Sequence, residues 1–142
     1  MLTEFEDNLA AMEQAMEAQQ RLCEAAEPDH PALAHSRWQL ARLGRIHAGF
    51  LTEQIFPLAQ RHAETKGGAG LLALRETWPA FGGSVSAFIA RWPLEAIATD
   101  WEGYRQDAAP LERNIRQRVQ QERQCLYDML AEIEGQAVSA PA

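Results

Sequence analysis

Hydrophobic residues recur along much of this chain at intervals of three and four, the repeat of a helix with one buried face. Over residues 2–26 these apolar positions are Leu2, Phe5, Leu9, Met12, Met16 and Cys23. Thr3 and Glu6 have the spacing of a capping box at the start of this segment. The stretch "AEPDHPALAH" contains two prolines, so the first helix is expected to end there.

A longer helix is predicted from about Ala32 to His62. Its stripe consists of Leu40, Leu43, His47, Phe50, Leu51 and Leu58. Pro57 lies inside this helix, and a kink is expected because proline removes one backbone hydrogen bond. The following "ETKGGAG" is rich in glycine and predicts a loop.

The third helical region, about Leu71 to Trp92, is the least regular. Pro79 and the pair Gly82-Gly83 are expected to divide it into two short pieces or to distort its middle. The stretch "RWP" at residues 91–93 should end it.

The final helix has the most regular pattern. Its seam reads Ile97, Trp101, Tyr104, Ala108, Leu111, Ile115, Val119, Glu122, Leu126, Met129 and Ile133. Thr99 or Asp100 is expected to cap it. Pro110 either bends this helix or begins a fresh one as its first residue.

The helical repeats together predict an all-α protein, because no stretch alternates convincingly with the period of a β-strand. Four amphipathic helices joined by short loops favour an up-down antiparallel four-helix bundle whose third helix is interrupted. We expect one domain over residues 1–135 and a disordered tail over residues 136–142.

Composition and net charge limit the classes of partner that this chain is expected to bind. The chain has 142 residues, of which 46% are hydrophobic and 23% charged, with a net charge of -7. A phosphate-binding groove needs a basic face, so nucleic acid is not an expected partner. We find no signal peptide and no apolar stretch long enough for a membrane helix, so a cytoplasmic protein is expected. Its two cysteines, Cys23 and Cys125, are expected to be reduced and not disulfide-bonded to each other.

Two ionisable residues, His47 and Glu122, fall on stripes that are otherwise apolar. An unpaired charge in a bundle interior is costly, so each should have a partner. Helix bundles often hold metal ions through histidine and glutamate from facing helices. The alternative is a hydrogen bond to a neighbouring side chain, which is how most buried polar groups are satisfied.

The segments "RWQLARLGRIHAGFLTEQIFPLAQ" and "RQRVQQERQCLYDMLAEI" resemble the two signature helices of the hemerythrin-like (HHE) bundle family. In that family the first helix carries a histidine, a glutamate four residues later, and an aromatic-proline pair near its end. The second carries His-x-x-x-Glu-Glu before a Leu-Tyr-Pro-like stretch. The resemblance implies a helical bundle with a di-iron centre.

Residue by residue, the resemblance is incomplete. His47 and Glu122 match two of the family's ligands. Phe56-Pro57 matches the aromatic-proline ending of the first signature helix, and Leu126-Tyr127 matches the Leu-Tyr pair of the second. Leu51 stands where the first carboxylate is expected, and Arg118 stands where the second histidine is expected. Asn8 and Phe88 lie in the neighbourhoods of further expected histidines. We therefore predict a degenerate metal site with no iron, and no other cofactor.

In place of the metal, His47, Arg118 and Glu122 are expected to form a polar cluster in the core; the other possibility is that Arg118 points outward. The leading function is a non-catalytic binding, sensing or interaction module, with an unidentified protein or small ligand as partner. One alternative is an iron- or oxygen-binding protein in which His47 and Glu122 hold the metal. Another is a structural homodimer. An enzyme is not expected, because no nucleophile, base and orienting group occur in a recognisable arrangement.

Overall fold

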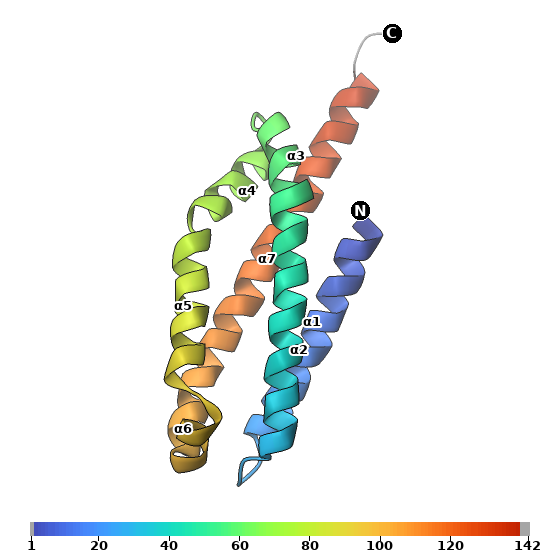
Figure 1. The fold of residues 1–142 in the computed structure, drawn as a ribbon. Coiled ribbons are helices and arrows are strands. Elements are labelled where there is room, and N and C mark those ends of the chain that lie inside the picture. The colour runs from blue at the N-terminus through green and yellow to red at the C-terminus, as the bar shows by residue number, and fades with distance from the viewer. Residues whose placement is uncertain (1, 140–142) are drawn as a thin grey trace.

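The computed structural model describes residues 2–139, which are almost entirely helical and contain no β-strand (Figure 1). This confirms the all-α prediction. The elements are α1 (Leu2–Cys23), α2 (His30–Phe50), the π-helix η1 (Leu51–Ile55), α3 (Phe56–Arg61), α4 (Lys66–Glu76), α5 (Trp78–Arg91), α6 (Leu94–Thr99) and α7 (Trp101–Ser139). No helix in this range is long and apolar enough to cross a membrane.

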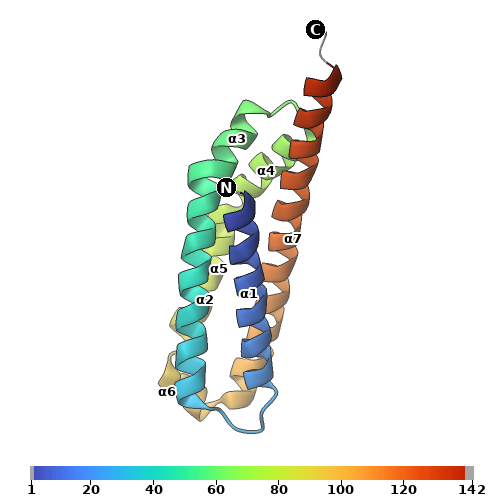
Figure 2. The same ribbon diagram turned by 90° about the vertical axis from the view of Figure 1, so that its right-hand side faces the viewer.

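The chain reverses direction three times along one long axis. It runs along α1, returns through α2, η1 and α3, passes back through α4, α5 and α6, and runs the length of the molecule again in α7 (Figures 1 and 2). The most extensive packing is between α1 and α2 and between α4 and α7. The N-terminal end of α1 and the C-terminal end of α7 therefore lie toward the same end of the molecule (Figure 2).

The first helix follows its predicted stripe closely, whereas α2 also buries Leu33 and Ser36, outside its predicted stripe, and leaves Leu40 and Phe50 only partly buried. Four of the predicted α1 positions are buried, namely Phe5, Leu9, Met12 and Met16, and two polar residues, Asn8 and Gln19, are buried with them. Between α1 and α2 the proline-containing break is present. Asp29 caps α2, accepting a hydrogen bond from the amide of Ala32 at 3.1 Å, and the helix begins at His30.

The predicted kink before Pro57 is instead a π-helical turn. The amide of Phe56 donates to the carbonyl of Leu51, five residues earlier, and Pro57 falls in the first turn of α3, where its missing N–H is tolerated. A π turn contains one residue more than an α turn, so the residues that follow it face the core one position later than a regular helix would place them. Ile55 and Ala59 are buried, and the predicted Leu58 is only partly so.

The glycine-rich "ETKGGAG" is not the predicted loop, because α4 begins inside it. Thr65 caps α4, accepting a hydrogen bond from Gly68 N at 2.9 Å. A Cβ on Gly67 would overlap the backbone of Met129 in α7, so glycine lets the two helices approach closely. Glu132 of α7 also accepts a hydrogen bond from the Gly67 amide at 3.2 Å. Glycine here serves helix packing.

The interruption of the third region lies earlier than predicted. It falls at Thr77, between α4 and α5, and the pair Gly82-Gly83 is helical within α5. Pro79 occupies the first turn of α5, and the helix ends at Arg91 as expected. Although α5 is strongly apolar, it contains no buried residue. The short α6 that follows was not foreseen as a separate helix.

The last helix is longer than predicted. Asp100 caps α7, because its Oδ1 accepts a hydrogen bond from the Gly103 amide at 2.9 Å. Pro110 lies inside a continuous helix. The helix extends through Ser139 and so includes residues 136–139 of the expected disordered tail, while 140–142 lie outside the described residues.

Buried side chains form two clusters. The larger one spans α1, α2, η1, α3, α4 and α7, and it surrounds the position of His47. The smaller one consists of Leu33, Trp92, Ile97, Tyr104 and Ala108, near the α6 end of the molecule. The polar residues of interest lie in or beside these two clusters.

Candidate functional site

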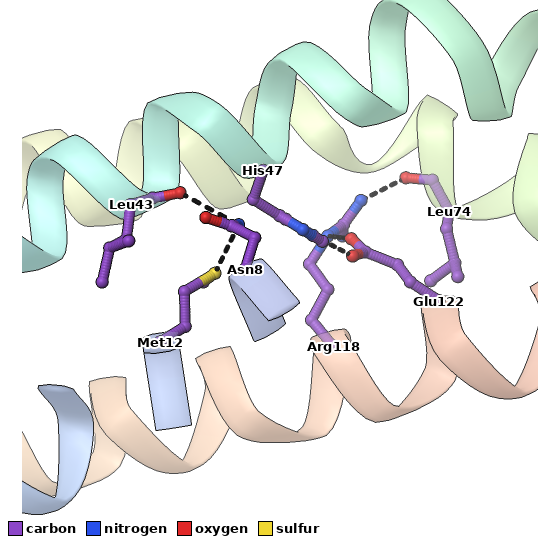
Figure 3. A network of polar contacts seen from close by, with 7 residues as sticks. All are labelled: Asn8, Met12, Leu43, His47, Leu74, Arg118 and Glu122. Atoms are coloured by element: carbon purple, nitrogen blue, oxygen red, sulfur yellow. Dashed lines mark hydrogen bonds and ion pairs between the residues drawn. The ribbon is translucent and has the colours of Figure 1, made fainter. Parts of the chain in front are cut away.

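His47 and Glu122 meet in the interior of the protein. His47 lies near the end of α2, just before η1, and is 4% exposed. Glu122 lies midway along α7 and is 1% exposed. The Nε2 atom of His47 is 2.6 Å from Oε2 of Glu122, as Figure 3 shows. The contact joins two helices that are far apart in sequence.

Arg118 lies one helical turn before Glu122 and points inward. Its Nε is 3.3 Å from Oε1 of Glu122. Its two terminal nitrogens donate to the Leu74 carbonyl and, at 2.9 Å, to the Thr77 hydroxyl, at the end of α4. The carbonyls at a helix C-terminus carry partial negative charge, so a guanidinium is favourable there. Arg118 therefore connects α7 to the junction of α4 and α5.

Two aromatic rings at the start of α5 cover the same guanidinium. The Arg118 Cζ lies 5.1 Å from the ring centroid of Trp78 and 4.9 Å from that of Phe81. These distances are typical of cation–π contacts, which strengthen when the cation is shielded from water. The charge of Arg118 is thus stabilised by Glu122, by the Leu74 carbonyl, by the Thr77 hydroxyl and by two ring faces.

The structure brings together His47, Arg118 and Glu122, the three residues of the predicted polar cluster. Asn8 of α1 lies beside them (Figure 3) and donates to the Leu43 carbonyl at 3.4 Å. Its contact with the sulfur of Met12 is weak, because thioether sulfur is a poor acceptor. Phe88 lies elsewhere, against Tyr104 in the smaller cluster.

Two buried nitrogens of the cluster make no hydrogen bond. One is Nδ1 of His47, and the other is Nε of Arg118, which lies at ion-pair distance, 3.3 Å, from Oε1 of Glu122. The Phe5 ring lies 5.7 Å from the imidazole. The imidazole of His47 therefore has an aromatic neighbour in the core.

The residues present do not fit the di-iron centre that the resemblance implies. Leu51, at the first carboxylate position, is fully buried and supplies no ligand. Arg118 brings a positive charge to the second histidine position, which opposes a divalent metal. Both oxygens of Glu122 are engaged, one by His47 and one by Arg118. Within residues 2–139 no group of three or more His, Cys, Asp or Glu side chains is arranged to hold a metal ion.

A second buried polar chain was not anticipated from the sequence. Ser36 donates to Oε1 of Gln19 at 2.7 Å, and Nε2 of Gln19 donates to the Tyr104 hydroxyl at 2.6 Å. Burial raises the pKa of Tyr104 to about 12. The only sequence signal was that Gln19 continues the apolar stripe three residues after Met16. This chain joins α1, α2 and α7 within the smaller cluster.

Both cysteines are free, which confirms the prediction that they are not bonded to each other. Burial raises the pKa of the Cys23 thiol to about 11, and nearby Glu112 adds to the effect. The pKa of Cys125 is also raised, again mainly by burial. A raised pKa lowers the thiolate fraction, so neither thiol is activated as a nucleophile.

Comparison with known proteins gives no independent identification: no protein-family model, curated protein or solved structure matches this chain. The resemblance to hemerythrin-like bundles therefore stays an interpretation of the residues in α2 and α7. An imidazole, a carboxylate and a guanidinium lie in contact with one another and cross-link α2, α4 and α7.

Proposed function

We propose that this protein is a hemerythrin-like up-down four-helix bundle that has lost its di-iron centre and acts as a non-catalytic binding or interaction module. In this proposal α2, η1 and α3 together are the second helix of the bundle. The third is made of α4, α5 and α6. The three reversals of the chain support this arrangement.

The observation that carries the proposal is the place of Arg118. Its guanidinium occupies the position where the family carries a histidine, and it is bonded to Glu122 and to the end of α4. A metal centre joins several helices of a bundle through its ligands. Here a network of ion pairs and hydrogen bonds makes a comparable cross-link, which lets the fold survive without the metal.

A binding role is favoured over catalysis because the polar cluster is enclosed. His47 and Glu122 are almost inaccessible, so a substrate could reach them only if the helices moved apart. Polar groups that are buried and paired in this way are better suited to fixing the register of neighbouring helices than to reacting with a substrate. Binding surfaces must then be sought on the outside of the helices.

Elemental analysis and visible absorption spectroscopy of protein purified from iron-replete cells test the proposal. The expected result is no stoichiometric iron and no charge-transfer band in the visible range. A reconstitution trial with ferrous iron under anaerobic conditions serves as a second arm, and it should leave the spectrum unchanged. Two irons per chain in either arm would refute the proposal.

A further inference from the structure

Helices α1 and α2 lie side by side and run in opposite directions (Figure 2). Contacts between the two helices fix their register, and they pair Phe5 with Phe50, Asn8 with Leu43 and Gln19 with Ser36. The N-terminal half of α1 is therefore level with the C-terminal half of α2. This register decides which outer residues of the two helices lie at the same height.

The outer face of α2 is apolar and basic. Trp38 is 56% exposed and Ile46 is 41% exposed, and the exposed Arg42 and Arg45 share this face at helical intervals of three and four. The Arg42 guanidinium lies 5.9 Å from the centroid of the Trp38 ring. No Asp or Glu occurs in α2, and within residues 2–139 neither arginine forms an ion pair. Because tryptophan and arginine are the residue types that most often carry binding energy, this face has the composition of a contact surface.

The adjacent outer face of α1 is acidic at its N-terminal end and nearly flat beyond it. Its residues, at intervals of three and four, are Glu4, Asp7, Ala11, Gln14 and Ala18. Glu4 and Asp7 are exposed, and in the described part of the chain neither has a salt-bridge partner. Glu6, by contrast, is turned toward α7, where it pairs with Arg123 at 2.7 Å. The stripe from Glu4 to Ala18 therefore lies on the side of α1 nearer to α2.

The two stripes are complementary in charge and in shape. A second copy placed across a two-fold axis parallel to the helices sets each α2 stripe against the α1 stripe of the other copy. In that arrangement Arg45 of one copy is level, within about one helical turn, with Asp7 of the other. Trp38 is level with the segment between Gln14 and Ala18, where the small alanine side chains leave room for the indole.

We propose that this protein forms a symmetric dimer through the outer faces of α1 and α2. The inference rests on the proposed interaction function and names its partner, a second copy of the same chain. Both halves of the contact are present on one molecule, so the basic stripe needs no acidic partner from another protein. The two-fold axis makes the interface isologous, so every contact between the stripes occurs twice.

Charge also selects the orientation of the two copies. A two-fold axis running across the helices would place α1 against α1 and α2 against α2. The acidic ends of α1 would then meet each other, and so would the arginines of α2. Like charges in contact oppose association, so the arrangement with each α2 against the other copy's α1 is favoured.

The size of the contact and the net charge predict a weak dimer. Helices of 22 and 21 residues present a face of about 30 Å by 20 Å, or about 600 Å² per copy. The total of about 1,200 Å² is at the lower end of specific interfaces. The net charge of -7 on each copy opposes approach. At physiological ionic strength, however, exposed charges act over only about 8 Å, so the complementary charges in direct contact dominate.

Sedimentation velocity of the full-length protein, over about a hundredfold range of concentration, tests the inference. The unchanged chain should show a monomer–dimer equilibrium. The double reversals Arg42→Glu/Arg45→Glu and Glu4→Lys/Asp7→Lys should each weaken the dimer about tenfold or more, because like charges then face each other. An equimolar mixture of the two variants should dimerise again, because the acidic α2 of one meets the basic α1 of the other while the unchanged faces meet as before.

Two further variants separate this contact from a general effect of charge. Arg75→Glu combined with Arg113→Glu gives the same net charge as the first double reversal, at two exposed positions outside the interface, and should leave the dimer intact. Trp38→Ala should weaken the dimer about tenfold or more, because it removes the largest apolar side chain of the contact. All the substituted positions are exposed, and circular dichroism confirms that each variant is folded.

A monomer at every concentration up to about 100 µM would overturn the inference. Dissociation by the control pair would overturn it too, as would a mixture of the two reversed variants that stays monomeric. A dimer that both reversals leave intact would assign the contact to another face and would equally refute this one. Iron content is measured separately, so failure here leaves the metal-free proposal standing, and iron binding would refute that proposal while leaving the dimer in place.

Discussion

His47 Nε2 and Glu122 Oε2 lie 2.6 Å apart, and the two residues are separated by 75 positions in sequence. The pair joins the interior of α2 directly to that of α7, and Arg118 extends the contact to the end of α4. Because each of these three side chains is in contact with another, removing one leaves a buried polar group without that partner. The predictions on the cluster follow from that dependence.

Replacing His47 by Leu should destabilise the protein by about 1–3 kcal/mol, because Oε2 of Glu122 would lose its donor in a buried position. Urea unfolding followed by circular dichroism measures the change. The control is His35→Leu, since His35 is exposed and should have little effect. An unchanged or increased unfolding free energy for the His47 variant would mean that the pair is not stabilising.

Replacing Arg118 by Met should cost more, up to about 3–5 kcal/mol, because it leaves the Glu122 carboxylate without its counter-ion in the core. It also removes the donors to Leu74 and Thr77 at the end of α4. Equilibrium unfolding followed by tryptophan fluorescence measures the loss. The matched control is Arg113→Met on the same helix, where the side chain is exposed. Equal stability of the two variants would contradict the role assigned to Arg118.

Two glycine-to-alanine substitutions should change the free energy of unfolding in opposite directions. Gly67→Ala should destabilise by about 1–3 kcal/mol, because the added Cβ would collide with the backbone of Cys125 and Met129. Gly83→Ala in α5 meets nothing within 4 Å and should stabilise by about 0.5–1 kcal/mol through its higher helix propensity. Thermal and urea unfolding of both variants decides the matter. A stabilising Gly67→Ala would show that α4 and α7 are not closely packed.

Stability should fall as the pH rises from 9 to about 12. Cys23 has its pKa raised from 9.0 to about 11, and Tyr104 from 10.0 to about 12, mainly by burial in both cases. Below pH 9 both groups are protonated in the folded and unfolded chain, so their contribution is fully present. Above it the unfolded chain loses protons first, which favours unfolding. Cys23→Ala should make the decline between pH 9 and about 11 shallower; an identical decline would exclude Cys23 as a contributor.

Introducing the two ligands that the hemerythrin-like resemblance implies should create metal affinity. The double substitution Leu51→Glu and Arg118→His would place two carboxylates and two histidines in one interior, a ligand set suited to iron or zinc. Titration with cobalt(II), followed by its visible absorption, should show binding by the double variant and none by the parent protein. Circular dichroism confirms folding, and the single variant Leu51→Gln controls for a polar residue at that position. No cobalt binding by a folded double variant would count against a shared ancestry with metal-binding bundles.

The sequence was most informative where the helical repeat is regular. Along α7 the seam correctly included Tyr104, Leu126 and Met129, all fully or almost fully buried. His47 and Glu122 were conspicuous because they interrupt apolar stripes, and a buried charge needs a partner. The partners of Arg118 on α4 and α5 were not foreseeable, because Pro79 indicates a break in the third region but not which side chain of another helix packs against it.

Two sequence-based predictions, a loop at the start of α4 and a regular helix through Leu58, were wrong for physical reasons that the hydrophobic repeat does not reveal. Glycines normally weaken helices, so the start of α4, residues 66–70, was predicted as a loop, although here the missing Cβ of Gly67 makes room for α7. The π turn was not expected because a 3.6-residue repeat assumes constant winding. Its extra residue moved the buried position from Leu58 to Ala59.

The absence of buried residues in α5 has a consequence for the order in which the protein opens. Backbone amides are protected from solvent hydrogen exchange according to the free energy of the local opening that exposes them. With Ile89 49% exposed and even Trp78 only partly buried, α5 gains little from burial and depends on its neighbours at α4 and α7. The amides of α5 should therefore exchange sooner than those of the α7 segment around Glu122, so that the molecule opens from its α5 side while α1, α2 and α7 remain together.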